Sequence, residues 1–171
     1  MIDVTFALVE EAVRILQGVA HCTPVLTSSQ IDTRSGARVF LKCENFQRVG
    51  AFKFRGAYHA IARLMSSQPS RVFATVSSGN HGQGLALACR LQGATAHIVM
   101  PKPFSAVKHR AVLGYGAQVH VAEDRSCADA TLRELVSDYR AVVVHPFNDP
   151  FVIAGQGAVM VSITLPISTS C

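Results

Sequence analysis

Residues 72–91 read V-F-A-T-V-S-S-G-N-H-G-Q-G-L-A-L-A-C-R-L. The first five form a short apolar run that predicts a buried strand, and the glycine-rich stretch after them predicts a tight turn. A helix is expected over 81–91. Ligands of open α/β sheets bind at the carboxyl ends of the strands, which is where this turn lies.

The same alternation of short apolar strands and helices continues to residue 150. It argues for a parallel sheet that is covered by helices on both faces and connected by right-handed crossovers. Residues 71–150 are therefore predicted to form a small doubly wound α/β domain with about four strands. Beyond residue 91, strands are expected over 96–100, 118–122 and 141–144, and helices over 106–113 and 127–139.

The flanking segments predict less regular structure. Apolar residues at spacings of three and four predict an amphipathic helix over 6–16, and a short helix should end near Gly36. A strand is expected over 38–44. Residues 150–157 are punctuated by glycine and ought to introduce another helix, although they do not do so convincingly. The stretch from residue 161, which is β-branched and broken by Pro166, neither continues an amphipathic helix nor caps one.

One lysine occupies an unusual position. Residues 50–57 read G-A-F-K-F-R-G-A and place Lys53 between two phenylalanines and beside Arg55. Burial and a nearby guanidinium both favour the neutral amine, which is the nucleophile that forms Schiff bases. From these eight residues alone, a lysine whose stem packs on a phenylalanine and whose ammonium lies in water is the simpler interpretation. An ion pair of Arg55 with Glu44 at the surface would add little stability.

The glycine-rich turn offers several hydrogen-bonding side chains. Ser77, Ser78, Asn80 and His81 precede or begin the predicted helix, whose free N–H groups and dipole attract an anion. The turn matches neither the G-x-G-x-x-G fingerprint nor a P-loop. It therefore predicts either a carboxylate or phosphate site or a well-capped tight turn.

Composition excludes several classes of function. The 16 lysines and arginines are scattered and form no basic stripe, so no nucleic-acid partner is expected. The histidines show no H-x-x-x-H pair, so no metal site is expected. The five cysteines form no C-x-x-C pair, which favours reduced thiols. Without a secretory signal or an apolar run of membrane-spanning length, the sequence predicts a cytoplasmic location and no membrane association.

Four segments together resemble one family. Residues 44–57, E-N-F-Q-R-V-G-A-F-K-F-R-G-A, resemble the cofactor-lysine motif of fold-type II pyridoxal-phosphate enzymes, above all serine/threonine dehydratases and serine racemases. S-S-G-N-H-G-Q-G-L-A resembles the family's asparagine loop, H-P-F-N-D-P-F-V-I-A-G-Q-G its return into the large domain, and H-C-T-P-V-L-T-S-S its N-terminal segment. The resemblance implies a tryptophan synthase β-like fold. Residues 1–66 would begin the large domain, 71–150 would form the small domain, and 151–171 would be a truncated return.

The resemblance also implies roles for individual residues. Lys53 would bind pyridoxal 5′-phosphate as a Schiff base and later act as the base at the substrate Cα. Phe52 would pack beside the cofactor and Asn80 would hydrogen-bond to it. Ser78 matches the residue that supplies the second base in racemases. The substrate carboxylate would be held by Ser77, Ser78, Asn80 and His81.

The implied activity is an ammonia-lyase that converts L-serine or L-threonine to a 2-oxo acid and ammonia. Serine racemase or hydroxyaspartate dehydratase is the alternative, because Ser78 fits both. The family's tetraglycine phosphate cradle and its divalent-cation site are not found in the 171 residues. A catalytically inactive fragment is therefore a further interpretation, and a nucleotide-binding α/β module is another. Full-length relatives are usually homo-oligomeric.

Overall fold

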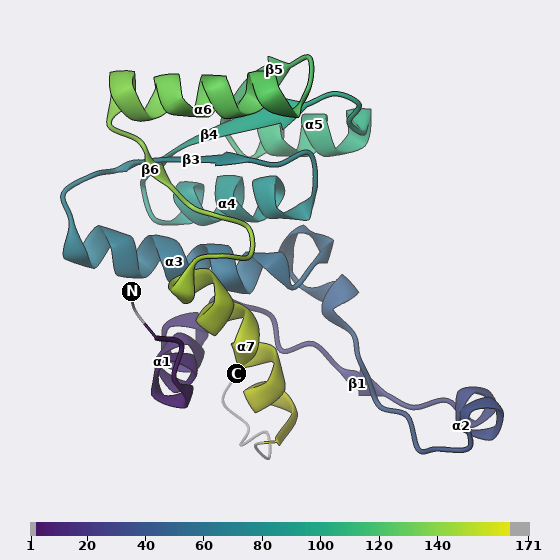
Figure 1. Cartoon of the computed structure of the whole chain (residues 1–171). Coiled ribbons are helices and arrows are strands. Elements are labelled where there is room, and N and C mark those ends of the chain that lie inside the picture. Colours follow the sequence, from purple (N-terminus) through teal and green to yellow (C-terminus); the bar gives the residue numbers. More distant parts are fainter. Residues whose placement is uncertain (1–2, 165–171) are drawn as a thin grey trace.

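A parallel sheet of four strands lies at the centre of the computed structural model, which describes residues 3–164 (Figure 1). The strand order is β5-β4-β3-β6, and every neighbouring pair is parallel. This sheet confirms the predicted α/β class and strand number. The strands are β3 (Val72–Val76), β4 (Thr95–Pro101), β5 (Gln118–Ala122) and β6 (Val142–Val143).

Helices cover both faces of the sheet. α4 (Asn80–Leu91) and α5 (Ala106–Gly114) lie on one face, and α6 (Arg125–Tyr139) lies on the other (Figure 1). Neighbouring residues of a strand point to opposite faces. Phe73 accordingly packs with the α4 side and Ala74 with the α6 side. Because both faces are buried, the strands read as continuous apolar runs rather than as alternating ones.

A second helical layer lies beneath α4 (Figure 1). It consists of α3 (Lys53–Ser67), which packs on α4, and of α1 (Phe6–Leu16) and α7 (Pro150–Thr164), which pack on α3 and on each other. The bounds of α1 match the sequence prediction. Thr5 caps α1, because its Oγ1 accepts a hydrogen bond from the Leu8 N–H group at 3.3 Å.

The helix that residues 150–157 ought to introduce, but did not convincingly predict, is present in the structure. α7 exists because its glycine serves packing: a Cβ on Gly155 would lie 2.7 Å from the Arg55 carbonyl oxygen, and one on Gly56 would lie 2.6 Å from that of Val152. The two helices therefore cross with their backbones almost in contact. Asp149 caps α7 by accepting hydrogen bonds from two N–H groups of its first turn. Glycine is usually read as a sign against a helix, and here it allows one.

The predicted strand over 38–44 is much shorter in the structure. β2 (Leu41–Lys42) pairs antiparallel with β1 (Val25–Leu26), and together with α2 (Ser29–Ser35) they form an arm that projects from the body (Figure 1). β2 has β1 as its one partner in the described chain, so no sheet extends it. Two short 3-10 turns then lead to Lys53, namely Glu44–Phe46 and Arg48–Gly50.

Among residues 3–164, three cysteines are free thiols, namely Cys43, Cys89 and Cys127. Cys22 is disulfide-bonded, so the expectation of reduced thiols is wrong for that residue. Within residues 3–164, no helix is both long and apolar enough to cross a membrane. The predicted break at Pro166 lies outside the described residues.

Candidate active site

Lys53 is the first residue of α3 and faces the loop that joins β6 to α7. Its side chain is half-buried, and its Nζ donates a hydrogen bond to the Pro146 carbonyl oxygen at 2.8 Å. The Phe52 ring centroid lies 5.2 Å from the same Nζ. Burial lowers the pKa of Lys53 below its ordinary value. Lys53 is therefore more readily neutral than an exposed lysine. The sequence suggested the nearby Arg55 charge as a second cause of the lowered pKa, but burial is the cause in the structure.

Arg55 turns instead toward Glu44, and the pair is buried rather than at the surface. The two side chains are 6% and 11% exposed, and two hydrogen bonds of 2.8 Å join the guanidinium to the carboxylate. Thr23 adds a third bond to Glu44 at 2.6 Å. Burial alone would raise the pKa of Glu44, but the bonds from Arg55 and Thr23 lower it overall. This cluster holds the chain on either side of the arm against α3, close to Lys53.

The asparagine loop, residues 77–81, connects β3 to α4 at the carboxyl edge of the sheet. Ser77 shapes the loop, because its Oγ accepts hydrogen bonds from the N–H groups of Gly79 at 3.2 Å and Gly82 at 3.0 Å. Ser78 is half-buried and Asn80 is exposed. Neither side chain has a hydrogen-bond partner within residues 3–164. Ser78 and Asn80 are thus free to bind a ligand, while Ser77 is engaged by the loop.

His81 is buried beneath the loop, with 4% of its surface exposed. Its Nε2 donates to the Val144 carbonyl oxygen at 3.1 Å, so the neutral ring presents Nδ1 as an acceptor, and that atom has no partner among the described residues. Burial, reinforced by the nearby Lys53 charge, lowers the pKa of His81 to about 4. In the structure His81 joins the asparagine loop to the end of β6, and its predicted role in binding the substrate carboxylate stays a prediction.

A glycine brings the lysine and the asparagine loop together. A Cβ on Gly84 would lie 3.2 Å from the Lys53 carbonyl oxygen and 3.3 Å from the Phe54 nitrogen, so α4 and the start of α3 are in near backbone contact. Asn80 lies one helical turn before Gly84 and therefore shares its face of α4. The candidate site thus combines the start of α3, the start of α4 and the loop after β6.

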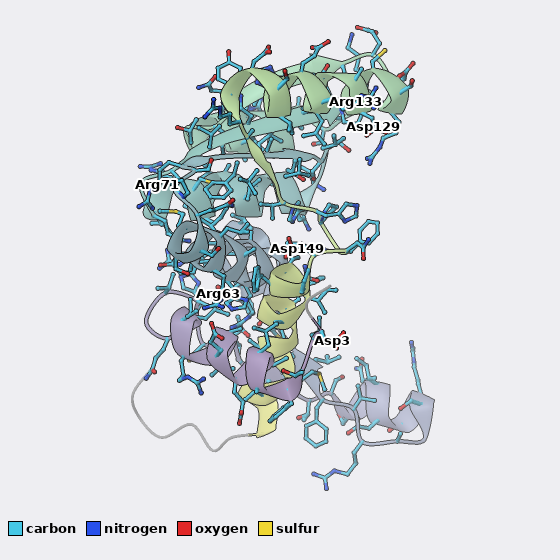
Figure 2. All side chains as sticks on the ribbon, turned by 60° about the vertical axis from the view of Figure 1, so that its left-hand side comes forward. Asp3, Arg63, Arg71, Asp129, Arg133 and Asp149 are labelled. Carbon is cyan, nitrogen blue, oxygen red and sulfur yellow. The ribbon has the colours of Figure 1, made fainter. Side chains whose placement is uncertain are left out.

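Sequence reasoning missed the residues that surround the lysine. Pro146 supplies a backbone carbonyl to Lys53, and Gln156 Nε2 lies 3.4 Å from that same oxygen. Figure 2 shows Asp149 at the start of α7, below the sheet, where the loop from β6 arrives. Both Pro146 and Gln156 fall in the segment H-P-F-N-D-P-F-V-I-A-G-Q-G, so the family resemblance was the signal that could have found them.

The buried His81 makes stability depend on pH. Because its pKa falls from 6.5 to about 4 on folding, the unfolded chain takes up the proton first as the pH drops. The contribution of His81 to the free energy of unfolding is fully present above about pH 6.5. It is lost as the pH falls toward 4, and the total loss is about 3 kcal/mol. Urea unfolding of wild type and His81→Gln at about pH 7.5 and 4.5 checks this, since glutamine keeps a donor without titrating. Equal pH dependence in both proteins would contradict it.

Comparisons with known proteins place this geometry in a family. Residues 16–166 match the family model described as pyridoxal-phosphate dependent enzyme. Serine racemase of Bos taurus is 38% identical over 164 residues, covering 94% of this chain and 49% of that protein. L-threo-3-hydroxyaspartate ammonia-lyase of Pseudomonas sp is 44% identical over 151 residues, covering 86% and 46%. The crystal structure of serine racemase from Dictyostelium discoideum superposes with a TM-score of 0.88 at 36% identity, over 94% of this chain and 52% of that one.

The chain belongs to the family of pyridoxal-phosphate dependent enzymes, as its sequence motifs predicted. It spans about half the length of the curated relatives that it matches.

The residues of this chain fit the cofactor of the family. Lys53 offers a half-buried amine of lowered pKa, and Asn80 offers an unbound amide on the adjoining helix start. When bound, pyridoxal phosphate supplies the electron sink that makes the Cα proton acidic. Within residues 3–164, no three His, Cys, Asp or Glu side chains are grouped so as to hold a metal ion.

Proposed function

We propose that this chain carries the lysine-bearing part of a pyridoxal 5′-phosphate-dependent ammonia-lyase for L-serine or L-threonine. One observation carries the proposal: the start of α3, which bears Lys53, packs against Gly84 of α4, the helix that the asparagine loop begins. The backbone of Lys53, whose amine has a lowered pKa, therefore adjoins a helix start with free donors. The relatives, a serine racemase and a hydroxyaspartate ammonia-lyase, support a small amino-acid substrate.

The side chains divide the chemistry among them. Lys53 holds the cofactor and, once released, takes the proton from the substrate Cα, a role that its lowered pKa favours. The N–H groups at the start of α4, with Ser78 and Asn80, hold the substrate carboxylate. His81 stays neutral and fixes this loop to Val144. Loss of the β-hydroxyl group, followed by hydrolysis, gives the 2-oxo acid and ammonia.

Racemisation of serine is the second candidate. The half-buried Ser78 hydroxyl has no partner in the described chain, so it is available as a second proton donor at the substrate Cα. Formation of D-serine from L-serine, measured beside pyruvate formation, separates the two reactions. We also propose a cytoplasmic enzyme without nucleic-acid or membrane partners that assembles as a homo-oligomer in its full-length form.

Trapping of the cofactor tests the proposal. Purified chain is incubated with pyridoxal phosphate, reduced with borohydride and digested, and the modified peptide is identified by mass spectrometry. We expect one cofactor on Lys53 and none in Lys53→Ala. Lys102→Ala is the matched control, because Lys102 is exposed and paired with Glu123.

Modification spread over several lysines, or unchanged in Lys53→Ala, would sink the proposed function. Selective trapping on Lys53 without turnover of serine, threonine or hydroxyaspartate would instead favour the inactive fragment. ATP binding without any trapping would favour the nucleotide-binding module.

A further inference from the structure

The backbone carbonyl of Pro146 accepts hydrogen bonds from two different helices. Lys53 Nζ, at the start of α3, donates the shorter bond at 2.8 Å. Gln156 Nε2, in α7, donates the longer bond at 3.4 Å. A carbonyl oxygen has two lone pairs and can accept both bonds at once. One oxygen atom therefore connects the lysine to a glutamine that the proposed chemistry does not use.

Gly56 makes room for the amide group of Gln156. A Cβ on Gly56 would lie 2.9 Å from Gln156 Cγ and 3.0 Å from its Nε2, so the glutamine side chain fills the space that the glycine leaves free. Both Gln156 and Pro146 are half-buried. This packing limits the positions of the amide group and keeps Nε2 within reach of the Pro146 oxygen. Gln156 thus belongs to the crossing of α3 and α7.

The charged groups around Lys53 have other partners. Arg55 of α3 is held in its buried ion pair, and His81 of α4 is neutral, with a pKa of about 4. In the segment before α7, His145 accepts a backbone hydrogen bond at Nδ1, and Asp149 accepts two at Oδ1. Burial lowers the pKa of Lys53. The shared carbonyl is therefore the polar contact through which the proton affinity of this lysine can be altered.

The carbonyl loses its stronger donor whenever the Lys53 nitrogen moves to a ligand. A half-buried acceptor that is left without a partner is costly. Gln156 remains as a donor to the same oxygen, and its long bond can shorten once the lysine has left. The glutamine thereby lowers the cost of releasing the amine.

We propose that Gln156 is a positioning residue for Lys53: it shares the Pro146 carbonyl, so that the amine can leave this oxygen and take up the cofactor. The proposal rests on the proposed function for the identity of the ligand, whereas the sharing of the carbonyl follows from the geometry. Two donors on one oxygen weaken each other's bonds. Without Gln156, the ammonium form of Lys53 is bound more strongly and gives up its proton less readily.

Gln156→Met tests the inference, because methionine keeps the length of the side chain without the donor. The pKa of Lys53 is measured on the whole chain without cofactor, from the NMR signals of its Cε group, which Lys53→Ala identifies among the four lysines. We expect this pKa to rise in Gln156→Met, and to rise further in Gln156→Glu, which adds a negative charge. Borohydride trapping of pyridoxal phosphate on Lys53 at neutral pH should be about threefold to tenfold slower in Gln156→Met.

Gln92→Met is the matched control. Gln92 Nε2 also donates to a backbone carbonyl of α3, that of Tyr58 at 3.1 Å, but this bond does not involve the Pro146 oxygen. The control should keep the wild-type pKa of Lys53 and the wild-type trapping rate. Urea unfolding of each variant separates a loss of stability from an effect on the lysine.

An unchanged pKa of Lys53 in both Gln156 variants overturns the inference, and so does an equal rise in Gln92→Met. A raised pKa and slower trapping in Gln156→Met, with Gln92→Met unchanged, support it. If the wild type traps no cofactor on Lys53, the proposed function fails, while the pKa comparison still decides whether Gln156 controls the amine. The two proposals can therefore fail separately.

Discussion

Replacing Gly155 with alanine is expected to lower the free energy of unfolding by about 2 kcal/mol or more. The new Cβ would lie 2.7 Å from the Arg55 carbonyl oxygen and 2.8 Å from both the Gly56 Cα and the His59 Cβ. None of these atoms belongs to a flexible side-chain end, so α3 and α7 must separate. Alanine gains about 1 kcal/mol of helix propensity over glycine, which the loss of packing outweighs.

Gly114→Ala is the matched control for this substitution. Gly114 is also helical, but outside its chain neighbours and the backbone of its own helix a Cβ there meets no described atom within 4 Å, so this variant should be as stable as wild type or more so. Urea unfolding followed by circular dichroism measures both. A Gly155→Ala protein that unfolds at the wild-type midpoint would show that the close helix crossing does not exist in solution.

The buried pair of Glu44 and Arg55 should have the other large effect. Glu44→Ala leaves the guanidinium group buried without its partner, which costs about 3–5 kcal/mol. Glu123→Ala breaks the exposed pair with Lys102 and should change stability by less than about 1 kcal/mol. Unfolding midpoints of the two variants provide the comparison, and equal losses would refute the difference that burial predicts.

The same pair also makes the stability of the fold depend on pH in the acid range. The pKa of Glu44 is lower in the folded chain than its ordinary value of 4.5. Its stabilising contribution is therefore present above about pH 4.5 and is lost as the pH falls through the folded pKa. Glu44→Gln should remove this part of the acid sensitivity while keeping most of the packing.

The sheet and its helices could be predicted because their signals are local. The apolar runs at β3 and β4 and the spacing of residues in α1 follow from which face each residue buries. α7 could not be found in this way, because Gly155 is informative only once its contact with Gly56 is known. The burial of Arg55 could not be predicted either, because it depends on contacts between distant segments. In the fold, its partner Glu44 is buried next to Thr23 and the arm.

The candidate site shows the same division. Lys53 and Asn80 could be proposed as site residues because motifs of contiguous residues mark them. The Pro146 carbonyl and the burial of His81 against Val144 could not, since a backbone contact between distant segments leaves no pattern in either one. The sequence therefore missed the surroundings of the candidate residues, which lie in distant segments of the chain.

The contact between Lys53 and Pro146 joins positions 93 residues apart, with the entire sheet between them. During synthesis the lysine emerges long before its partner, so at first it is an ordinary hydrated ammonium group. Closing a loop of this length is a late and entropically costly event in folding. The half-buried environment of Lys53 therefore forms only after the intervening domain has been made and has returned the chain to the start of α3.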